Sequence, residues 1–139
     1  MLDVLLPFGM IKILLVDDAT VDVMLTTIAL EDSHVPHELC VARDGEEAYE
    51  ILTNQSVDLL LLDIKMPKVS GFDLLRRLRD VSRDAPTTIV LSGSGLQTDR
   101  AQARDLGAVQ FIQKAVDFSA FKMELKEAVV KHGVCQAAR

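Results

Sequence analysis

Apolar and polar positions alternate in blocks along the chain, and these blocks predict five strands that are separated by helices. The central block, VDLLLLDIKMPKVSG at residues 57–71, holds a nearly continuous apolar run that ends at Asp63 and is followed by turn residues. Such a run predicts a strand that is buried on both faces, as in a parallel sheet covered by helices. Four further apolar runs predict strands at residues 10–16, 38–42, 87–91 and 109–112.

The segments between these runs carry the spacing of helices. One face of the first predicted helix is formed by Val21, Met24, Leu25 and Ile28. Asp44 can cap the second helix, and Glu47 stands at the capping-box position. The remaining helices are predicted around residues 72–78, at residues 98–106, where Gly107 ends the helix, and at residues 117–132, where Gly133 does so.

Strand and helix patterns therefore alternate five times, which predicts a three-layer α/β sandwich. Parallel strands need long crossovers, and every interval in this chain can hold a helix. Right-handed crossovers with helices on both faces of the sheet predict the flavodoxin-like strand order 2-1-3-4-5. We expect a five-stranded parallel sheet with five helices, and a ligand site outside the carboxyl ends of the strands.

Length and composition fit one domain, which we place at residues 10–133 between an N-terminal extension at 1–9 and a C-terminal tail at 134–139. The chain has 139 residues, of which 49% are hydrophobic, and a net charge of −6, which argues against a general nucleic-acid binder. No apolar run is long enough to span a membrane. Cys40 and Cys135 form no metal-binding motif, which favours a reducing, cytoplasmic setting.

Reactive side chains stand where four of the predicted strands end. Asp17 and Asp18 follow the first strand, Asp63 the third, Ser92 the fourth and Lys114 the fifth. The carboxyl ends of parallel strands share one edge of the sheet, so we expect these groups to meet. Crowded carboxylates repel one another, and a divalent cation removes that conflict; oxygen ligands with retained waters suit Mg²⁺.

An aspartate beside Mg²⁺, with a hydroxyl and an ammonium aimed at the same point, suits phosphoryl transfer. Asp63 can act as the nucleophile and form an aspartyl phosphate, while the metal and Lys114 neutralise charge on the transferring oxygens. Taken singly, each feature has an ordinary explanation: an acidic pair starts a helix, a serine before glycine makes a turn, and a lysine after a strand is solvated. Their agreement at four strand ends favours the site.

The motifs KILLVDDA, LLLDIKMPKVSG, IVLSGSG and GAVQFIQKAVD make the chain resemble the response-regulator receiver domains of two-component signalling, over residues 11–130. The resemblance implies that Asp63 is the phosphoacceptor, loaded by a sensor histidine kinase, and that Lys114 contacts the phosphoryl group. It also implies a Mg²⁺ site made by Asp17, Asp18, Asp63 and the backbone carbonyl of Lys65. Only self-phosphorylation and slow self-dephosphorylation are then expected, rather than enzymatic turnover.

The resemblance further implies a conformational switch. Ser92 moves toward the phosphate, Phe111 turns inward, and Lys65 and Ser94 tune hydrolysis. The family's usual homodimer face is the surface of the fourth helix, fifth strand and fifth helix. Because the chain ends at Arg139, soon after the last helix, we expect a single-domain regulator without a DNA-binding output domain.

One position departs from the family pattern and keeps alternatives open. Ala115 stands where the family has proline, usually with a cis peptide, and a cis bond before alanine costs about 3 kcal/mol. The Lys114–Ala115 bond is therefore either trans or a strained cis bond. The alternative is a pseudo-receiver that binds proteins without phosphorylation; an aspartate-based phosphohydrolase and a flavin carrier rank lower. Val116-Asp117, with Phe121 beyond, resembles regulators found with phytochrome-type kinases.

Overall fold

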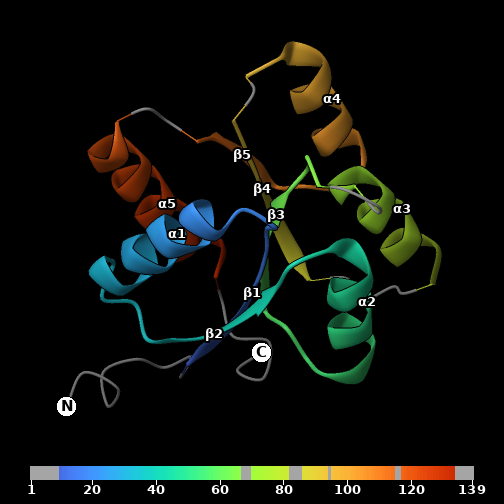
Figure 1. Cartoon of the computed structure of the whole chain (residues 1–139), viewed down its shortest axis with the longest axis horizontal. Coiled ribbons are helices and arrows are strands. Elements are labelled where there is room, and N and C mark those ends of the chain that lie inside the picture. Colours follow the sequence, from blue (N-terminus) through green and yellow to red (C-terminus); the bar gives the residue numbers. More distant parts are fainter. Residues whose placement is uncertain (1–9, 67–69, 82–85, 94, 115–116, 134–139) are drawn as a thin grey trace.

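Five strands and five helices alternate along the part of the chain that the structure describes (Figure 1). This structure is a computed structural model, and it describes residues 10–66, 70–81, 86–93, 95–114 and 117–133. The strands are β1 (Ile11–Val16), β2 (His37–Ala42), β3 (Leu59–Asp63), β4 (Thr87–Ser92) and β5 (Gln110–Gln113). The helices are α1 (Thr20–Asp32), α2 (Gly45–Asn54), α3 (Gly71–Val81), α4 (Gln97–Asp105) and α5 (Phe118–His132).

The strands form one parallel sheet in the order β2-β1-β3-β4-β5, which confirms the predicted flavodoxin-like topology. β3 is the central strand and pairs with β1 on one side and β4 on the other. All five of its residues are buried, as its nearly continuous apolar sequence requires. Asp63, the last of them, pairs in register with Leu91 of β4.

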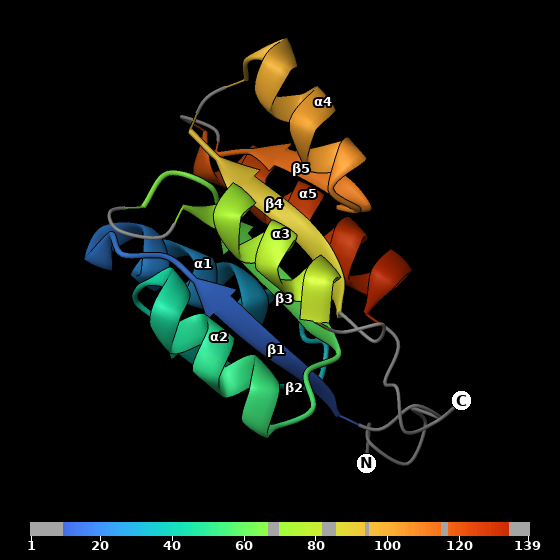
Figure 2. The same cartoon turned by 90° about the vertical axis from the view of Figure 1, so that its right-hand side faces the viewer.

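Helices cover both faces of the sheet and produce two cores. α1 and α5 lie on one face, and α2, α3 and α4 lie on the other, in front of the sheet in Figure 2. Successive residues of β3 point to opposite faces. Leu59 and Leu61 therefore join the core beneath α1 and α5, whereas Leu60 and Leu62 join the core beneath α2 and α3.

α1 confirms the predicted helix, but the face that the spacing identifies is not the face that packs in the core. Its buried residues are Val23, Thr26, Ala29 and Leu30. The four residues that the spacing grouped together do share a face, but that face is exposed: Val21 (65%), Met24 (57%), Leu25 (37%) and Ile28 (41%). Because apolar residues occupy both sides of this helix, spacing alone does not select the packed side. We call the four exposed residues the α1 strip.

The helix ends agree with the predicted signals. The carboxylate of Asp44 accepts a hydrogen bond from the N–H of Glu47 at 2.8 Å, and Glu47 accepts one from the N–H of Arg43 at 2.7 Å. Gly107 follows α4 with a φ of 100°, a conformation that favours glycine. Among the described helices, none has the length and apolar character needed to cross a bilayer. Residues 1–9 and 134–139 lie outside the described residues, so the domain limits remain a prediction.

Candidate functional site

Three carboxylates meet at the carboxyl edge of the sheet. Asp17 and Asp18 follow β1, and Asp63 ends the neighbouring strand β3. One carboxylate oxygen from each lies within 4.8 Å of the others. Asp17 is fully buried and Asp63 is 6% exposed, whereas Asp18 faces solvent. Negative charges this close together, and largely removed from water, require a counter-charge.

Lys114, which follows β5, supplies that counter-charge. Its Nζ lies 2.9 Å from Asp17 Oδ2, 2.9 Å from Asp22 Oδ2 and 3.7 Å from Asp63 Oδ2. Its backbone N–H donates to the carbonyl of Ser92 at 2.6 Å, which ties the end of β5 to the end of β4. Burial alone lowers the pKa of Lys114, but hydrogen bonds to Asp17 and Asp22 raise it above its ordinary value, so the ammonium stays charged.

Asp63 has an unusually basic carboxylate. Burial raises the pKa of Asp63 to about 6, and the nearby charge of Asp17 adds to the rise. Lys114 opposes it, as does the N–H of Lys65, which donates to Asp63 Oδ1 at 3.1 Å. At neutral pH Asp63 is therefore mainly ionised and poorly solvated. A cation or an electrophile at its oxygens relieves that state.

The α3 terminus closes tightly over the end of β3. A Cβ added to Gly71 would lie 2.6 Å from the carbonyl oxygen of Asp63 and 2.7 Å from the Cα of Ile64. The Gly71 N–H also donates to the Ile64 carbonyl at 3.3 Å. Gly71 therefore lets the start of a helix approach the backbone of Asp63, which a side chain would prevent.

The cluster has the chemistry of a divalent-cation site. The described residues that group closely enough are Asp17, Asp18 and Asp63, all of which offer carboxylate oxygens, the donors that hard cations such as Mg²⁺ prefer. No histidine or cysteine belongs to this group of described residues, as a zinc site would need. The ammonium of Lys114 already balances charge there. These residues therefore fit such an ion.

The structure brings together most of the side chains that the sequence analysis selected. Ser92 is fully buried at the end of β4, between the strands that carry Asp63 and Lys114. The Lys65 side chain is exposed, although its N–H reaches Asp63. Ser94 and Ala115 lie outside the described residues, so the hydrolysis role of Ser94 and the cis or trans state of the Lys114–Ala115 bond stay predictions.

Asp22 belongs to the site and was missed by the sequence analysis. It lies in the first turn of α1 and accepts a hydrogen bond from Lys114 at 2.9 Å. Its only signal in the sequence is its position one helical turn beyond Asp18, a spacing that suits an ordinary acidic residue at a helix start equally well.

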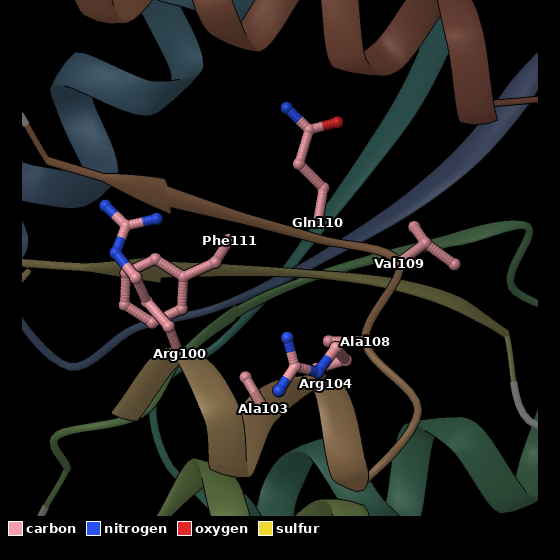
Figure 3. Close-up of a pocket in the computed structure, with 7 residues that line it drawn as sticks. All are labelled: Arg100, Ala103, Arg104, Ala108, Val109, Gln110 and Phe111. Atoms are coloured by element: carbon pink, nitrogen blue, oxygen red, sulfur yellow. The ribbon is translucent and has the colours of Figure 1, made fainter. Parts of the chain in front are cut away.

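Phe111 lies apart from the carboxylates, on β5 beside α4. Figure 3 shows its ring beneath Arg100 of α4, whose guanidinium carbon lies 4.6 Å from the ring centroid. Both residues line a pocket of about 200 Å³ between α4 and β5, together with Ala103, Arg104, Ala108, Val109 and Gln110. Phe111 is thus half-buried at a surface, with a cation on its face.

A flavodoxin-like sheet that gathers three carboxylates and a lysine at its carboxyl edge is the class of α/β domain that the fold and the site define. The family comparison makes this specific, because the sequence profile described as response regulator receiver domain matches residues 13–126. The chain therefore belongs to the response regulator receiver domain family of two-component systems. Proteins of this family are signalling proteins rather than a family of catalytic enzymes.

Individual relatives agree with this assignment. CpxR, a transcriptional regulatory protein of Escherichia coli (strain K12), is 41% identical over 104 residues, which are 74% of this chain and 42% of CpxR. The chain thus spans less than half the length of this relative. The phosphorylated cyanobacterial phytochrome response regulator RcpA superposes with a TM-score of 0.78 at 32% identity, covering 89% of this chain and 94% of RcpA. The Mn²⁺-bound form of the response regulator Rcp1 superposes with a TM-score of 0.75 at 26% identity, covering 85% of this chain and 91% of Rcp1.

Proposed function

We propose that this protein is a response regulator that accepts a phosphoryl group on Asp63 from a histidine kinase and signals by a conformational switch. The observation that carries the proposal is the environment of Asp63. Its carboxylate, with a pKa raised to about 6 by burial, ends the central strand beside Asp17 and within 3.7 Å of the Lys114 ammonium. A poorly solvated carboxylate next to a fixed cation suits nucleophilic attack on phosphorus.

In the proposed transfer, an oxygen of Asp63 attacks the phosphorus of a phosphohistidine. A new P–O bond forms, the P–N bond breaks, and the electron pair leaves with the imidazole, which takes up a proton. Lys114 offers its ammonium to the phosphoryl oxygens, and the N–H of Lys65 steadies the acceptor carboxylate through the 3.1 Å hydrogen bond to Asp63 Oδ1. The same residues would later hold the acyl phosphate during its slow hydrolysis.

Mg²⁺ is the proposed cofactor. Asp17, Asp18 and Asp63 would hold the ion, together with the backbone carbonyl of Lys65. The bound ion would neutralise charge on the phosphoryl oxygens. The grouping supports this site, because one oxygen from each of the three carboxylates lies within 4.8 Å of the others, close enough to share one ion.

Ser92 and Phe111 are the proposed switch. Ser92 lies at the end of β4, where it pairs in register with Gln113 of β5. Phe111 lies two positions before Gln113 and pairs with Val90. A shift of Ser92 toward a phosphoryl group would open space beside β5 into which Phe111 turns. This would remodel the α4–β5–α5 surface, the kind of two-state response that phosphorylation produces.

The donor is proposed to be a sensor histidine kinase of the phytochrome type, a choice supported by the likeness to RcpA. A protein donor must cover the edge of the sheet to bring its phosphoryl group to Asp63. The α1 strip gives it an apolar surface beside that edge, because α1 begins two residues after Asp18.

We propose a protein partner rather than nucleic acid or membrane, given the net charge of −6. The free thiol of Cys40 fits the cytoplasm as the compartment.

We also propose that phosphorylation changes self-association through the α4–β5–α5 face. Leu96, at the start of α4, and Val109, beside the pocket between α4 and β5, are exposed at 59% and 49%. Sedimentation velocity of the full chain with and without acetyl phosphate tests this: a shift from monomer to dimer that needs Asp63 supports the face as the output surface. A sedimentation coefficient that is unchanged by phosphorylation contradicts it.

Intact-mass spectrometry after exposure to acetyl phosphate tests the main proposal. Wild type should gain one phosphoryl group with Mg²⁺ present, and neither Asp63→Asn nor wild type in chelator should gain it. The matched control is Asp58→Asn, which changes a buried aspartate at the opposite end of the same strand. If wild type gains no mass with acetyl phosphate or with a phosphorylated histidine kinase, the pseudo-receiver alternative holds instead.

A further inference from the structure

Asp22 forms an ion pair with Lys114 at the site, although it is not among the carboxylates that group as a cation site. Its Oδ2 lies 2.9 Å from Lys114 Nζ, the same distance as Asp17 Oδ2. The Lys114 side chain is 17% exposed and that of Asp22 is 39% exposed, whereas that of Asp17 is fully buried. The ammonium therefore bridges an inner carboxylate and an outer one.

Both oxygens of the inner carboxylate already accept a hydrogen bond. Asp17 Oδ2 accepts from Lys114, and Asp17 Oδ1 accepts from the N–H of Ala19 at 3.0 Å. A divalent cation held by Asp17 would therefore lie close to the ammonium that already binds Oδ2. Two cations at one carboxylate also repel each other strongly in a partly buried site. Lys114 must weaken its contact with Asp17 when the ion enters, yet it must stay near Asp63.

We propose that Asp22 is the positioning residue that retains the Lys114 ammonium at the site while the divalent cation takes over Asp17. This inference rests on the proposed function, because it concerns the lysine that meets the phosphoryl group. Asp22 can carry this role because it pairs with Lys114 without belonging to the group formed by Asp17, Asp18 and Asp63. It also lies in the first turn of α1, where the helix dipole stabilises a carboxylate.

The consequence is that cation binding and lysine placement are linked. With Asp22 present, Lys114 keeps an ion pair with Asp22 when the ion takes over Asp17, so little ion-pair energy is lost. Without Asp22, the ammonium depends on Asp17 and Asp63 alone, and the ion must displace it into solvent. Removal of Asp22 should therefore weaken Mg²⁺ binding chiefly through Lys114, rather than through the general loss of one negative charge.

A double-mutant cycle on Mg²⁺ affinity tests this, measured by isothermal titration calorimetry on the full chain. Asp22→Asn should weaken Mg²⁺ binding about tenfold in the native background, as expected for coupled neighbours. In a Lys114→Ala background the same change should weaken it by no more than about twofold, the remaining effect of a screened charge. Asp22→Glu, which keeps the carboxylate, should recover part of the affinity.

The matched control is Asp32→Asn. Asp32 is also on α1 and pairs with a lysine of α5, Lys122, at 3.0 Å, but it lies at the other end of the helix. This variant loses the same charge and should leave Mg²⁺ affinity within about twofold of wild type. Circular dichroism confirms that each variant is folded before titration.

The outcomes separate this inference from the proposed function. An Asp22→Asn effect of equal size in both backgrounds, or one matched by Asp32→Asn, overturns the positioning role while Mg²⁺ binding by wild type stands. Wild type that binds no Mg²⁺ overturns the proposed metal-dependent function, and the positioning role is refuted with it. A large effect that requires Lys114 supports the inference.

Discussion

The guanidinium carbon of Arg100 lies 4.6 Å from the ring centroid of Phe111, over the face of the ring. Helix α4 thus places a cation on an aromatic ring of β5. Contacts of this kind at partly exposed sites stabilise one arrangement by about 0.5–1 kcal/mol. If Phe111 turns inward on phosphorylation, this contact belongs to the unphosphorylated state and opposes the switch.

Arg100→Ala should therefore make the switched state easier to reach. Loss of the ring contact should speed phosphorylation by acetyl phosphate about two- to fivefold, because the acceptor-competent population rises. Time-resolved intact-mass spectrometry measures the initial rate. Arg104→Ala is the control, since Arg104 lines the same pocket one helical turn later and loses the same charge. Equal rates for the two variants would show that the ring contact does not restrain the switch.

Asp63 should make the protein's stability depend on pH. Its pKa is about 6 in the folded state, against an ordinary value of 3.8, so the folded chain binds the proton more tightly than the unfolded chain. Stability therefore falls as the pH rises from about 4 to 6, and above pH 6 the buried carboxylate destabilises the fold by about 3 kcal/mol. Asp63→Asn should be more stable than wild type by that amount at pH 7 and by almost nothing at pH 4.

Urea unfolding in chelator at the two pH values measures this difference. Asp105→Asn changes the net charge equally at an exposed position of α4 and should show no such gain at pH 7. A gain for Asp63→Asn that is the same at both pH values would mean that burial does not perturb this carboxyl group.

Gly71 should be intolerant of a side chain. Gly71→Ala forces its Cβ to within 2.6 Å of the Asp63 carbonyl oxygen, so α3 or the end of β3 must shift. We expect a loss of about 1–3 kcal/mol in the free energy of unfolding, as for other overpacked sites, with slower phosphorylation. Gly93→Ala is the matched control for stability, because a Cβ there meets nothing within 4 Å. Similar stabilities for the two variants would contradict the close approach.

Mg²⁺ should stabilise the folded protein. A ligand that binds only the folded state, present at a hundred times its Kd, adds about 2.7 kcal/mol. Thermal unfolding with and without chelator should therefore show a higher Tm in Mg²⁺ for wild type, and a much smaller shift for Asp18→Asn. Sodium chloride at equal ionic strength controls for screening. An equal shift in both proteins would exclude Asp18 as a ligand.

Much of the fold follows from local sequence because each strand is a short apolar run that ends at a turn. The central run of four leucines suits the middle of a sheet that helices cover on both faces. The structure places β3 there. The positions of Asp17, Asp63 and Lys114 then follow, since parallel strands end at a common edge.

The packed face of α1 and the contact of Asp22 with Lys114 could not be predicted from the local sequence. Helical spacing identifies a face only when the opposite side is polar, and α1 has apolar residues on both sides. Asp22 meets Lys114 across 92 positions of sequence, and no local pattern indicates that contact. It depends on how α1 leaves β1 relative to the end of β5, which is a property of the assembled sheet.

The burial of β3 has a consequence for how the protein opens. Leu59 to Leu62 each have a register partner on both β1 and β4 and are covered by helices on both faces of the sheet, so their amides should exchange with deuterium only through global unfolding. The proposed phosphoacceptor Asp63 thus directly follows the slowest-exchanging segment of the molecule. Fluctuations that admit a phosphodonor must arise in the surrounding loops and helix ends, while the backbone beneath the acceptor keeps one position.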